Sequence, residues 1–412
     1  MPNVALLSYF ASNKTTRVFL LRPDRSEPLA FDTQVTPQEL GACLQRLLID
    51  FHGIGDDNWP EGDSADSIRQ ALKLEPAVDA QKRKQRVMSQ TLSNPACSYR
   101  MTYWDSLSGR LLPHDLRTEV ADCDLLCISP HGPLHSLPLA ALRWSKEGYL
   151  IERFGICDIN SAGVLRYCQA KNRARTSRHR PASCMIAAVA SAEDHEPSTL
   201  EGDGDWLAKL FRERNPHSKV TRLVGARPAD GQKPASKDEI QKAIGEHDVV
   251  HFACHGVFGM RGTKGDPLDS GLLVSDGNSR PLTSDASCLD ARQMAPHTLT
   301  AREVFSLRLT ADLVTLRACS SGRAYIRSGD ELMGLVRSFL YAGAPSLLLS
   351  LWDVNQESSQ LLLEGFYRRW LNPEDPIPKW RALQLAQQCL LRIPKYQHPY
   401  HWAPFVLIGD WV

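Results

Sequence analysis

The second half of the chain alternates short apolar runs with amphipathic segments, and this alternation limits the fold more than any other feature. Residues 248–253, 312–318 and 346–352 are predicted to be buried strands that are mainly hydrophobic. Runs without polar alternation are typical of strands buried on both faces, as in a parallel sheet covered by helices. Further strands are predicted over residues 184–190, 219–224 and 405–408. The sequence therefore predicts an α/β fold with a mostly parallel sheet flanked by helices on both faces.

Helical segments separate these strands. Residues 236–245 begin with Ser236, three positions before Glu239, which is the spacing of a helix-capping box. Helices are also predicted over residues 206–214, 331–341, 356–370 and 380–391. In an open α/β sheet, sites form beyond the carboxyl ends of the strands, so the residues that follow each strand are the ones to search for chemistry.

The first part of the chain has a looser pattern. Residues 4–10 and 17–21 predict a hairpin of short strands, and residues 124–129 predict one apolar strand. A helix is predicted over residues 37–51, and a polar, charged helical segment over residues 56–94. This pattern indicates a smaller set of elements placed before the alternating half.

A basic run separates the two parts. Residues 171–182 hold five Lys or Arg side chains and lack a large hydrophobe, which is typical of an exposed linker. A nucleic-acid-binding arm is the alternative for this run. A length of 412 residues is consistent with about two domains. We therefore expect a leading half over residues 1–170, the basic linker, and a second half over residues 183–412.

Composition excludes several classes of function. Lys and Arg number 48 against 47 Asp and Glu, so the chain has no electrostatic footprint for nucleic acid or an anionic membrane surface. The apolar runs are far shorter than the roughly 20 residues of a membrane helix, and the start has no signal-peptide pattern. The 11 cysteines form no zinc-ligand spacing, so no metal or other cofactor is expected. We expect a cytoplasmic protein in which most thiols pack in the core.

Two strand ends carry the residues of thiol chemistry. The strand over residues 248–253 runs into His255 and Gly256, and the strand over residues 312–318 runs into Cys319. If these strands are neighbours, an imidazole lies beside a thiol, which it can activate or whose leaving group it can protonate. The amides of Gly256 and Cys319 could then hold an oxyanion. A buried thiol and a hydrogen-bonded loop histidine are the alternative reading of the same spacing.

Longer motifs surround both strand ends. They are His-Phe-Ala-Cys-His-Gly at 251–256, Asp-Pro-Leu-Asp-Ser-Gly-Leu-Leu-Val-Ser at 266–275, Arg-Ala-Cys-Ser-Ser-Gly at 317–322 and Ser-Leu-Trp-Asp-Val at 350–354. Residues 299–309, 329–344 and 400–409 add ordered matches. Together they resemble the CHAT family of caspase-like cysteine peptidases, which are related to separases, metacaspases and caspases. Residues 6–10 and 129–138 resemble the family's related but catalytically silent leading domain.

The resemblance implies roles for individual residues. His255 matches the family's catalytic histidine, Cys319 its nucleophile, and Gly256 the glycine whose N–H joins the amide of Cys319 in the oxyanion hole. It implies a protein substrate and an activating protein or upstream protease, often in bacterial defence or cell death. CRISPR-associated antiviral systems are one such setting. A catalytically silent, peptide-binding scaffold of the same fold is the alternative, and an acyltransferase or other thiol hydrolase is a third class.

Four charged residues are candidates for the pocket that binds the P1 side chain of a substrate. Arg317 shares a strand face with Cys319 and would suit an acidic P1 residue. Asp330, Asp353 and Glu357 could bind Arg or Lys, and we favour this basic P1 residue. The position comparable to the separase S1 carboxylate is Gln360 here, a departure from that pattern. A helix cap at Asp330 and an ion pair at Arg317 are the alternatives.

Other residues near the motifs have structural interpretations. We expect Cys254 to face the core, because successive strand side chains point to opposite faces. We also expect His251 to be a hydrogen-bonded core histidine and His131 to be structural, although His131-Gly132 imitates the dyad strand end. The polar segment 276–297, with Arg280, Arg292 and Met294, could be a lid, a cleavage site or an inert insertion. Large aromatics near the strand ends could line the cleft but belong more often to the core: Trp352, Trp402 and Phe405.

Overall fold

The computed structural model describes ten segments of the chain. They are residues 2–41, 102–146, 148–176, 181–189, 197–225, 232–257, 266–276, 294–320, 330–352 and 356–412. Most of the helix expected over 37–51, the whole polar segment 56–94 and most of the loop 276–297 lie outside the described residues. Within the described segments, no helix combines the length and the apolar character that a membrane span requires.

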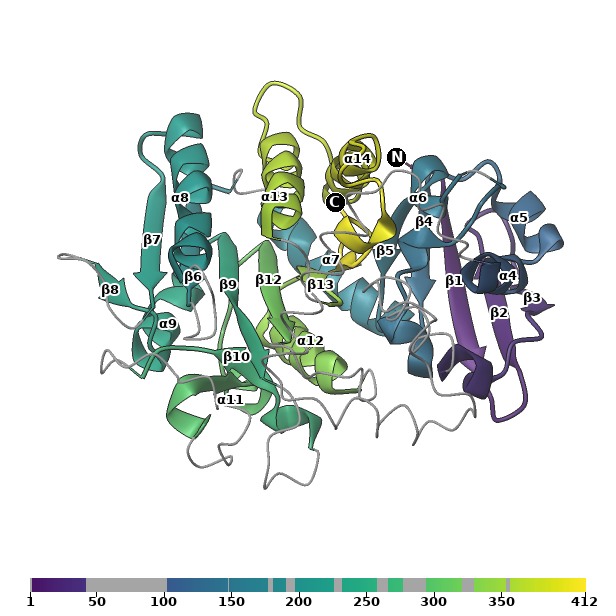
Figure 1. Cartoon of the computed structure of the whole chain (residues 1–412), viewed down its shortest axis with the longest axis horizontal. Coiled ribbons are helices and arrows are strands. Elements are labelled where there is room, and N and C mark those ends of the chain that lie inside the picture. The colour runs from purple at the N-terminus through teal and green to yellow at the C-terminus, as the bar shows by residue number, and fades with distance from the viewer. Residues whose placement is uncertain are drawn as a thin grey trace.

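A single sheet organises the described residues (Figure 1). From one edge its strands are β3 (Leu29–Asp32), β2 (Thr16–Leu21), β1 (Val4–Ala11), β4 (Leu125–Ser129), β5 (Gly155–Asp158), β14 (Phe405–Gly409), β13 (Ser346–Ser350), β12 (Leu313–Ser320), β9 (Val249–Val257), β6 (Ser183–Ala188), β7 (Lys219–Val224) and β8 (Lys233–Pro234). Two short strands, β10 (Gly271–Leu273) and β11 (Thr298–Thr300), form a hairpin beside the end of β9. The predicted strands are therefore confirmed, with β3, β5, β8, β10 and β11 in addition.

Most neighbouring strands are parallel. β1, β4, β5 and β14 form one parallel block, and β13, β12, β9, β6, β7 and β8 form another. The two blocks run antiparallel where β13 meets β14. The hairpin of β1 and β2 is antiparallel, as its short connection requires. The predicted mostly parallel sheet is thus confirmed.

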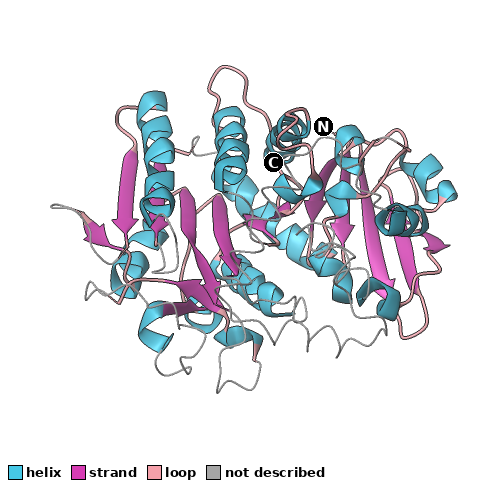
Figure 2. Cartoon of the chain, in the orientation of Figure 1, coloured by secondary structure: helices cyan, strands magenta, loops and turns pink. Residues whose placement is uncertain are grey.

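Helices cover both faces of this sheet (Figure 2). Figure 1 shows α8 (Pro197–Arg214), α13 (Gln356–Trp370) and α14 (Lys379–Leu391) along its upper side and α9 (Lys237–Ala243), α11 (Ala301–Phe305) and α12 (Asp330–Ala342) along its lower side. Two apolar clusters correspond to these layers. Val249 and Leu313 belong to the cluster beneath α8 and α13, whereas Val250 and Val314 belong to the other. Both faces are buried, which explains the mainly hydrophobic strands in the sequence.

Local signals account for the position of several helices. Ser236 caps α9 by accepting the backbone N–H of Glu239, as the capping-box spacing predicts. Helix α13 spans the predicted range, and α14 begins one residue earlier than predicted. Helix α8 begins at Pro197, nine residues before the predicted start. Its first two turns are rich in Gly, Ser and acidic residues, so they carry little apolar periodicity for a sequence argument to find.

The basic run begins inside a helix. Helix α7 (Ala162–Thr176) contains the first six residues of that run, so the linker expected from residue 171 is wrong for those six. The buried Asn172 of α7 donates to the carboxylate of Asp410, which follows β14. The sheet is also continuous across the boundary, because Ile408 of β14 pairs with Asp158 of β5. The division into two domains stays a prediction.

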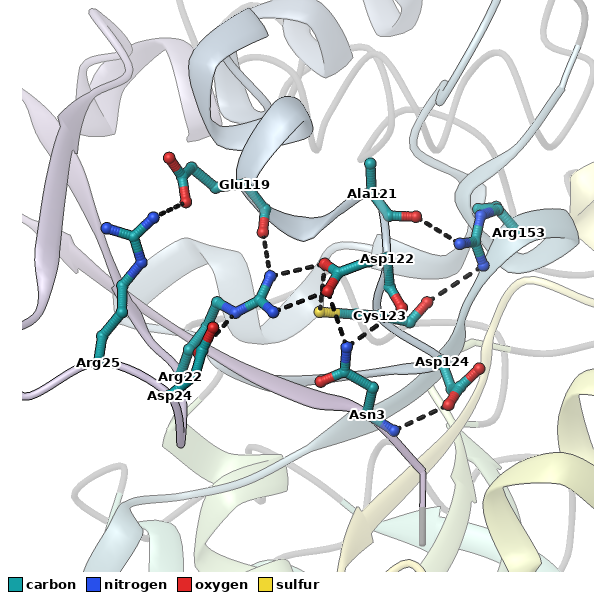
Figure 3. Close-up of polar contacts among 10 residues, drawn as sticks. All are labelled: Asn3, Arg22, Asp24, Arg25, Glu119, Ala121, Asp122, Cys123, Asp124 and Arg153. Atoms are coloured by element: carbon teal, nitrogen blue, oxygen red, sulfur yellow. Dashed lines mark hydrogen bonds and ion pairs between the residues drawn. The ribbon is translucent and has the colours of Figure 1, made fainter.

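Polar contacts join the first hairpin to the start of β4 (Figure 3). The guanidinium of Arg22 donates to both carboxylate oxygens of Asp122 at 2.6 and 2.8 Å, and also to Asp24 at 3.0 Å. The backbone N–H of Asn3 donates to Asp124 at 2.8 Å. Arg22 holds the pKa of Asp122 well below its usual range. These contacts fix β1 and β2 beside the segment that enters β4.

The remaining helices complete the leading half. They are α4 (Thr102–Leu111), α5 (His114–Val120) and α6 (Leu150–Arg153). Buried residues of all three, such as Trp104, Leu116 and Leu150, belong to the same apolar cluster as Val249 and Leu313. One core therefore extends from the first hairpin to the strands that carry the candidate dyad.

Candidate active site

Strands β9 and β12 are parallel neighbours, as the dyad prediction required. Their register contains eight pairs, of which the seventh joins Cys319 to His255 and the eighth joins Ser320 to Gly256. The two residues predicted to act together are therefore opposite each other in adjacent strands. This outcome depends on tertiary pairing, because 64 positions separate them in the sequence.

Alternation along each strand places both residues on one face. Val249 and Leu313 face the cluster beneath α8 and α13, and residues an even number of positions later share that face. His255 and Cys319 are both six positions later. His255 is half-buried in the described structure. His255 thus lies on the α8 and α13 face of the sheet, and its register partner is Cys319.

Cys254 lies on the opposite face. It is 3% exposed and packs in the second apolar cluster with Phe252 and Val250. The prediction that Cys254 faces the core is confirmed. The neighbouring thiol is therefore a packing residue in this structure, and Cys319 is the cysteine that the register places beside His255.

The strand that carries His255 is longer than predicted. β9 continues to Val257 because β10 pairs with its end, with Leu272 opposite Gly256 and Gly271 opposite Val257. A Cβ at Gly271 would lie 2.4 Å from the carbonyl oxygen of Leu299, so only glycine fits between these backbones. The residues past the predicted end of this strand are therefore also strand, with β12 on one side and β10 on the other.

The two expected oxyanion donors lie inside this ladder. The carbonyl of Asp248 accepts the N–H of Leu313 at 3.4 Å, which fixes the direction of the alternating amides in β9 and β12. By the same alternation, the N–H of Gly256 points toward β12 and the N–H of Cys319 points toward β9. Each amide is thus directed at the neighbouring strand rather than toward a substrate in this conformation.

The four candidates for the S1 pocket differ in where they lie and in whether the structure describes their side chains. Arg317 is 6% exposed, lies opposite Ala253 and shares the face of the dyad. Glu357, in the first turn of α13, forms an ion pair with Lys395 at 2.5 Å, and Lys395 holds the pKa of this carboxylate below its usual range. Asp353 and the side chain of Asp330 lie outside the described residues. Gln360 is half-buried in α13.

A buried polar contact lies on the same face, in the row of the sheet two residues before Arg317 on β12. His251 is fully buried, and its Nδ1 lies 3.3 Å from the hydroxyl of Tyr367 in α13. Burial lowers the pKa of His251 to about 4, so the imidazole is neutral near pH 7. The prediction of a hydrogen-bonded core histidine is confirmed. Sequence reasoning missed Tyr367, whose signal was a single aromatic hydroxyl on the buried side of an amphipathic helix.

The profile of the CHAT domain matches residues 102–410. The chain belongs to the CHAT domain family. Two proteins called tetratricopeptide repeat protein 28 are similar to it. The human protein is 28% identical over 294 residues and the mouse protein 27% over 301 residues. Each alignment covers 68% of this chain and 12% of the relative, so the chain spans a small part of these proteins.

Solved structures of a separase resemble this CHAT-family chain in fold. Two crystal structures of the Saccharomyces cerevisiae separase–securin complex superpose with TM-scores of 0.51 and 0.52 at 12% identity. They cover 99% of this chain and 30% of the separase chain. At this identity the likeness concerns the fold alone, and it confirms the caspase-like architecture.

His131 has local partners in the leading half of the CHAT-family chain. It stacks against Phe10 with ring centroids 5.0 Å apart, and its Nδ1 accepts the N–H of Ala11 at 3.3 Å. These contacts agree with a structural role. The large aromatics near the strand ends are at most 6% exposed and belong to the core cluster: Trp352, Trp402 and Phe405. The interpretation of these side chains as core residues is therefore confirmed.

Six cysteines outside the candidate dyad are packing residues in the core. All six are buried: Cys123, Cys127, Cys157, Cys168, Cys184 and Cys254. Burial raises the pKa of the Cys123 and Cys168 thiols to about 11, which keeps them protonated near neutral pH. Within the described segments no cluster of three His, Cys, Asp or Glu side chains could hold a metal ion.

The described ends of segment 276–297 pack against the fold. Asp276 lies 3.9 Å from the imidazole of His297, and Met294 is 3% exposed. Arg280 and Arg292 lie outside the described residues. Whether the segment is a lid, a cleavage site or an insertion therefore stays a prediction.

Proposed function

We propose that this CHAT-family chain is a cysteine endopeptidase that uses Cys319 as nucleophile and His255 in proton transfer. The observation that carries the proposal is the register of β9 and β12, which pairs Cys319 with His255 on one sheet face. Such a pair supplies both groups that peptide cleavage by a thiol requires. Family membership supports the same chemistry.

The reaction proceeds in two steps. The Cys319 thiolate attacks the scissile carbonyl, and His255 gives a proton to the leaving amine as the carbon–nitrogen bond breaks. Water then attacks the thioester, returning the thiol and releasing the carboxylate product. The amides of Gly256 and Cys319 stabilise the oxyanion in both steps.

The engaged amides imply that the described conformation precedes activation. Both oxyanion donors point into the β9 and β12 ladder, so the last two register pairs have to separate before these amides can face a substrate. We therefore propose that an activating protein or an upstream protease releases the strand ends. The separase structures are complexes with securin, which supports a protein partner for a chain of this fold. We further propose a place in bacterial defence or cell death.

Substitution of the nucleophile tests the enzyme assignment. Cys319→Ala is expected to abolish cleavage of partner proteins in a reconstituted mixture, with a loss of about 10⁴-fold or more. Cys254→Ala is the matched control, because this adjacent thiol is buried in the apolar core on the other face of the sheet. Cleavage that persists in Cys319→Ala would show that the nucleophile is assigned wrongly.

The same mixture separates the competing classes. A wild-type chain that binds a peptide partner but cuts no protein under any activating condition would favour the scaffold. Turnover of esters or acyl transfer without peptide cleavage would favour the third class.

The P1 preference follows from which charge lines the pocket. We propose Arg or Lys at P1, bound by Asp330 or Asp353, since Glu357 is already paired with Lys395. Mass spectrometry of the new termini tests this proposal. Cleavage after Asp or Glu would instead assign the pocket to Arg317, which shares the dyad face.

A further inference from the structure

The hydroxyl of Tyr367 contacts both strands that carry the dyad. Its oxygen lies 2.6 Å from Oγ1 of Thr315 on β12 and 3.3 Å from Nδ1 of His251 on β9. All three side chains are at most 1% exposed. Because Thr315 and His251 are register partners, one hydroxyl bridges the two strands within a single row of the sheet.

This bridge lies on the same two strands as the dyad, four residues earlier along each strand. Thr315 is four positions before Cys319, and His251 is four positions before His255. Four positions along a strand keep the same face and advance about 13 Å. The row that Tyr367 bridges is therefore aligned with the dyad row, on the same face and along the same two strands.

The groups that form this bridge are uncharged near neutral pH. Burial lowers the pKa of His251 to about 4 and raises the pKa of Tyr367 well above its usual value. The imidazole and the phenol are thus both neutral near pH 7. Two donor orders fit these contacts. Nδ1 of His251 accepts from the Tyr367 hydroxyl while Thr315 donates to the Tyr367 oxygen, or Nδ1–H donates to Tyr367 while the Tyr367 hydroxyl donates to Thr315. The result is a chain of hydrogen bonds that involves no charge.

Helix α8 also contacts the imidazole of His251, through the indole of Trp206. The indole of Trp206 packs edge-on against His251, with ring centroids 6.2 Å apart and planes at 87°. It also lies 5.8 Å from the ring of Tyr367. Four elements, α8, α13, β9 and β12, therefore meet at this bridge.

We propose that Tyr367 is a positioning residue of the dyad. Its hydroxyl holds β9, β12 and α13 in one arrangement, and this arrangement sets the distance and orientation between His255 and Cys319. A small change in geometry at such a site has a large effect on thiol chemistry. The link to peptide cleavage rests on the proposed function, whereas the effect on the Cys319 thiol does not.

Tyr367→Phe removes the hydroxyl and keeps the ring. We expect the pH midpoint for alkylation of Cys319 by iodoacetamide, followed by peptide-resolved mass spectrometry, to rise by about half a unit or more, because His255 no longer stabilises the thiolate as well. In activated protein we expect kcat to fall about 10-fold, with KM changed less than twofold. Thr315→Val removes the other hydroxyl of the chain and is expected to act in the same direction.

Tyr9→Phe is the matched control. Tyr9 is 3% exposed, and its hydroxyl donates to the carbonyl of Leu111 at 2.9 Å in the leading half. This variant also loses one buried hydrogen bond. It is expected to lower the unfolding temperature about as much as Tyr367→Phe does, without moving the pH midpoint for alkylation of Cys319. An unchanged midpoint in both Tyr367→Phe and Thr315→Val would overturn the proposal. A shifted midpoint in a protein that cleaves no substrate would retain the positioning role and remove the peptidase function.

Discussion

Two strand ends of this chain carry a His-Gly pair, and they differ in what lies opposite the histidine. In the second half, the ladder of β9 and β12 continues through His255, which pairs with Cys319. In the leading half, the ladder of β4 and β5 ends at Ile128 and Asp158, so His131 lies beyond it. The same dipeptide thus lies inside a ladder in one half and outside it in the other.

The residue that would face His131 has another role. Extending the register of β4 and β5 by three rows would bring Ser161 opposite His131. The hydroxyl of Ser161 accepts the N–H of Val164 at 3.2 Å, at the start of α7. A dyad therefore needs a strand that continues past its neighbour's histidine, whereas β5 turns directly into a helix.

Alanine substitutions at the two histidines give the largest expected difference. His255→Ala is expected to reduce cleavage by activated protein about 10³-fold or more, because the proton donor to the leaving amine is lost. His131→Ala removes only the contacts with Phe10 and Ala11 and should leave kcat within about twofold. Equal losses of kcat in the two variants would contradict the division between an active and a silent strand end.

The boundary between the halves is expected to respond to pH. Asp158 ends β5, pairs with Ile408 and is 8% exposed, and burial raises the pKa of its carboxyl to about 7. Its uncharged form is favoured by folding. The stability it contributes is present below about pH 4, where the unfolded carboxyl is also protonated, and is lost as pH rises to about 7.

Asp158→Asn removes this titration. From pH 5 to pH 8 the wild type should lose at most about 3 kcal/mol of free energy of unfolding relative to Asp158→Asn, because about two pH units below the raised pKa lie in this window. Denaturant unfolding at both pH values measures the difference. Asp115→Asn, at an exposed carboxylate of α5, is the control and should track the wild type. If the free energy of unfolding of the wild type changes from pH 5 to pH 8 by the same amount as that of Asp158→Asn, the raised pKa of Asp158 is contradicted.

The polar contacts of the first hairpin predict a smaller effect, confined to the leading half. Arg22→Met breaks the contacts with Asp122 and Asp24 shown in Figure 3 and should lower the unfolding temperature by about 2–4 °C near pH 7. Because Arg22 depresses the pKa of Asp122, the stability from this pair is lost as pH falls below the usual carboxyl range. The difference between Arg22→Met and wild type should therefore shrink in acid. A changed alkylation rate of Cys319 in this variant would show that the two halves are more tightly coupled than the comparison implies.

The sequence by itself determined the fold class and most of the strands, and it predicted the candidate dyad. Strands with little polar alternation, such as residues 346–352, are typical of burial on both faces, and local propensity places the helices between the strands. His255 and Cys319 were identifiable because thiol chemistry requires these residue types at strand ends, in motifs typical of one family. Four-residue β5 was missed because so short a run carries little periodic signal.

Only the tertiary structure decided how these elements meet. The pairing of His255 with Cys319, the amides of Gly256 and Cys319 directed into the ladder, and the helix that continues into the basic run all depend on contacts between distant segments. The bridge from Tyr367 to two strands is of the same kind. Register and hydrogen-bond partners are set by the packing of whole layers, whereas a sequence pattern reports only which face of each element is buried.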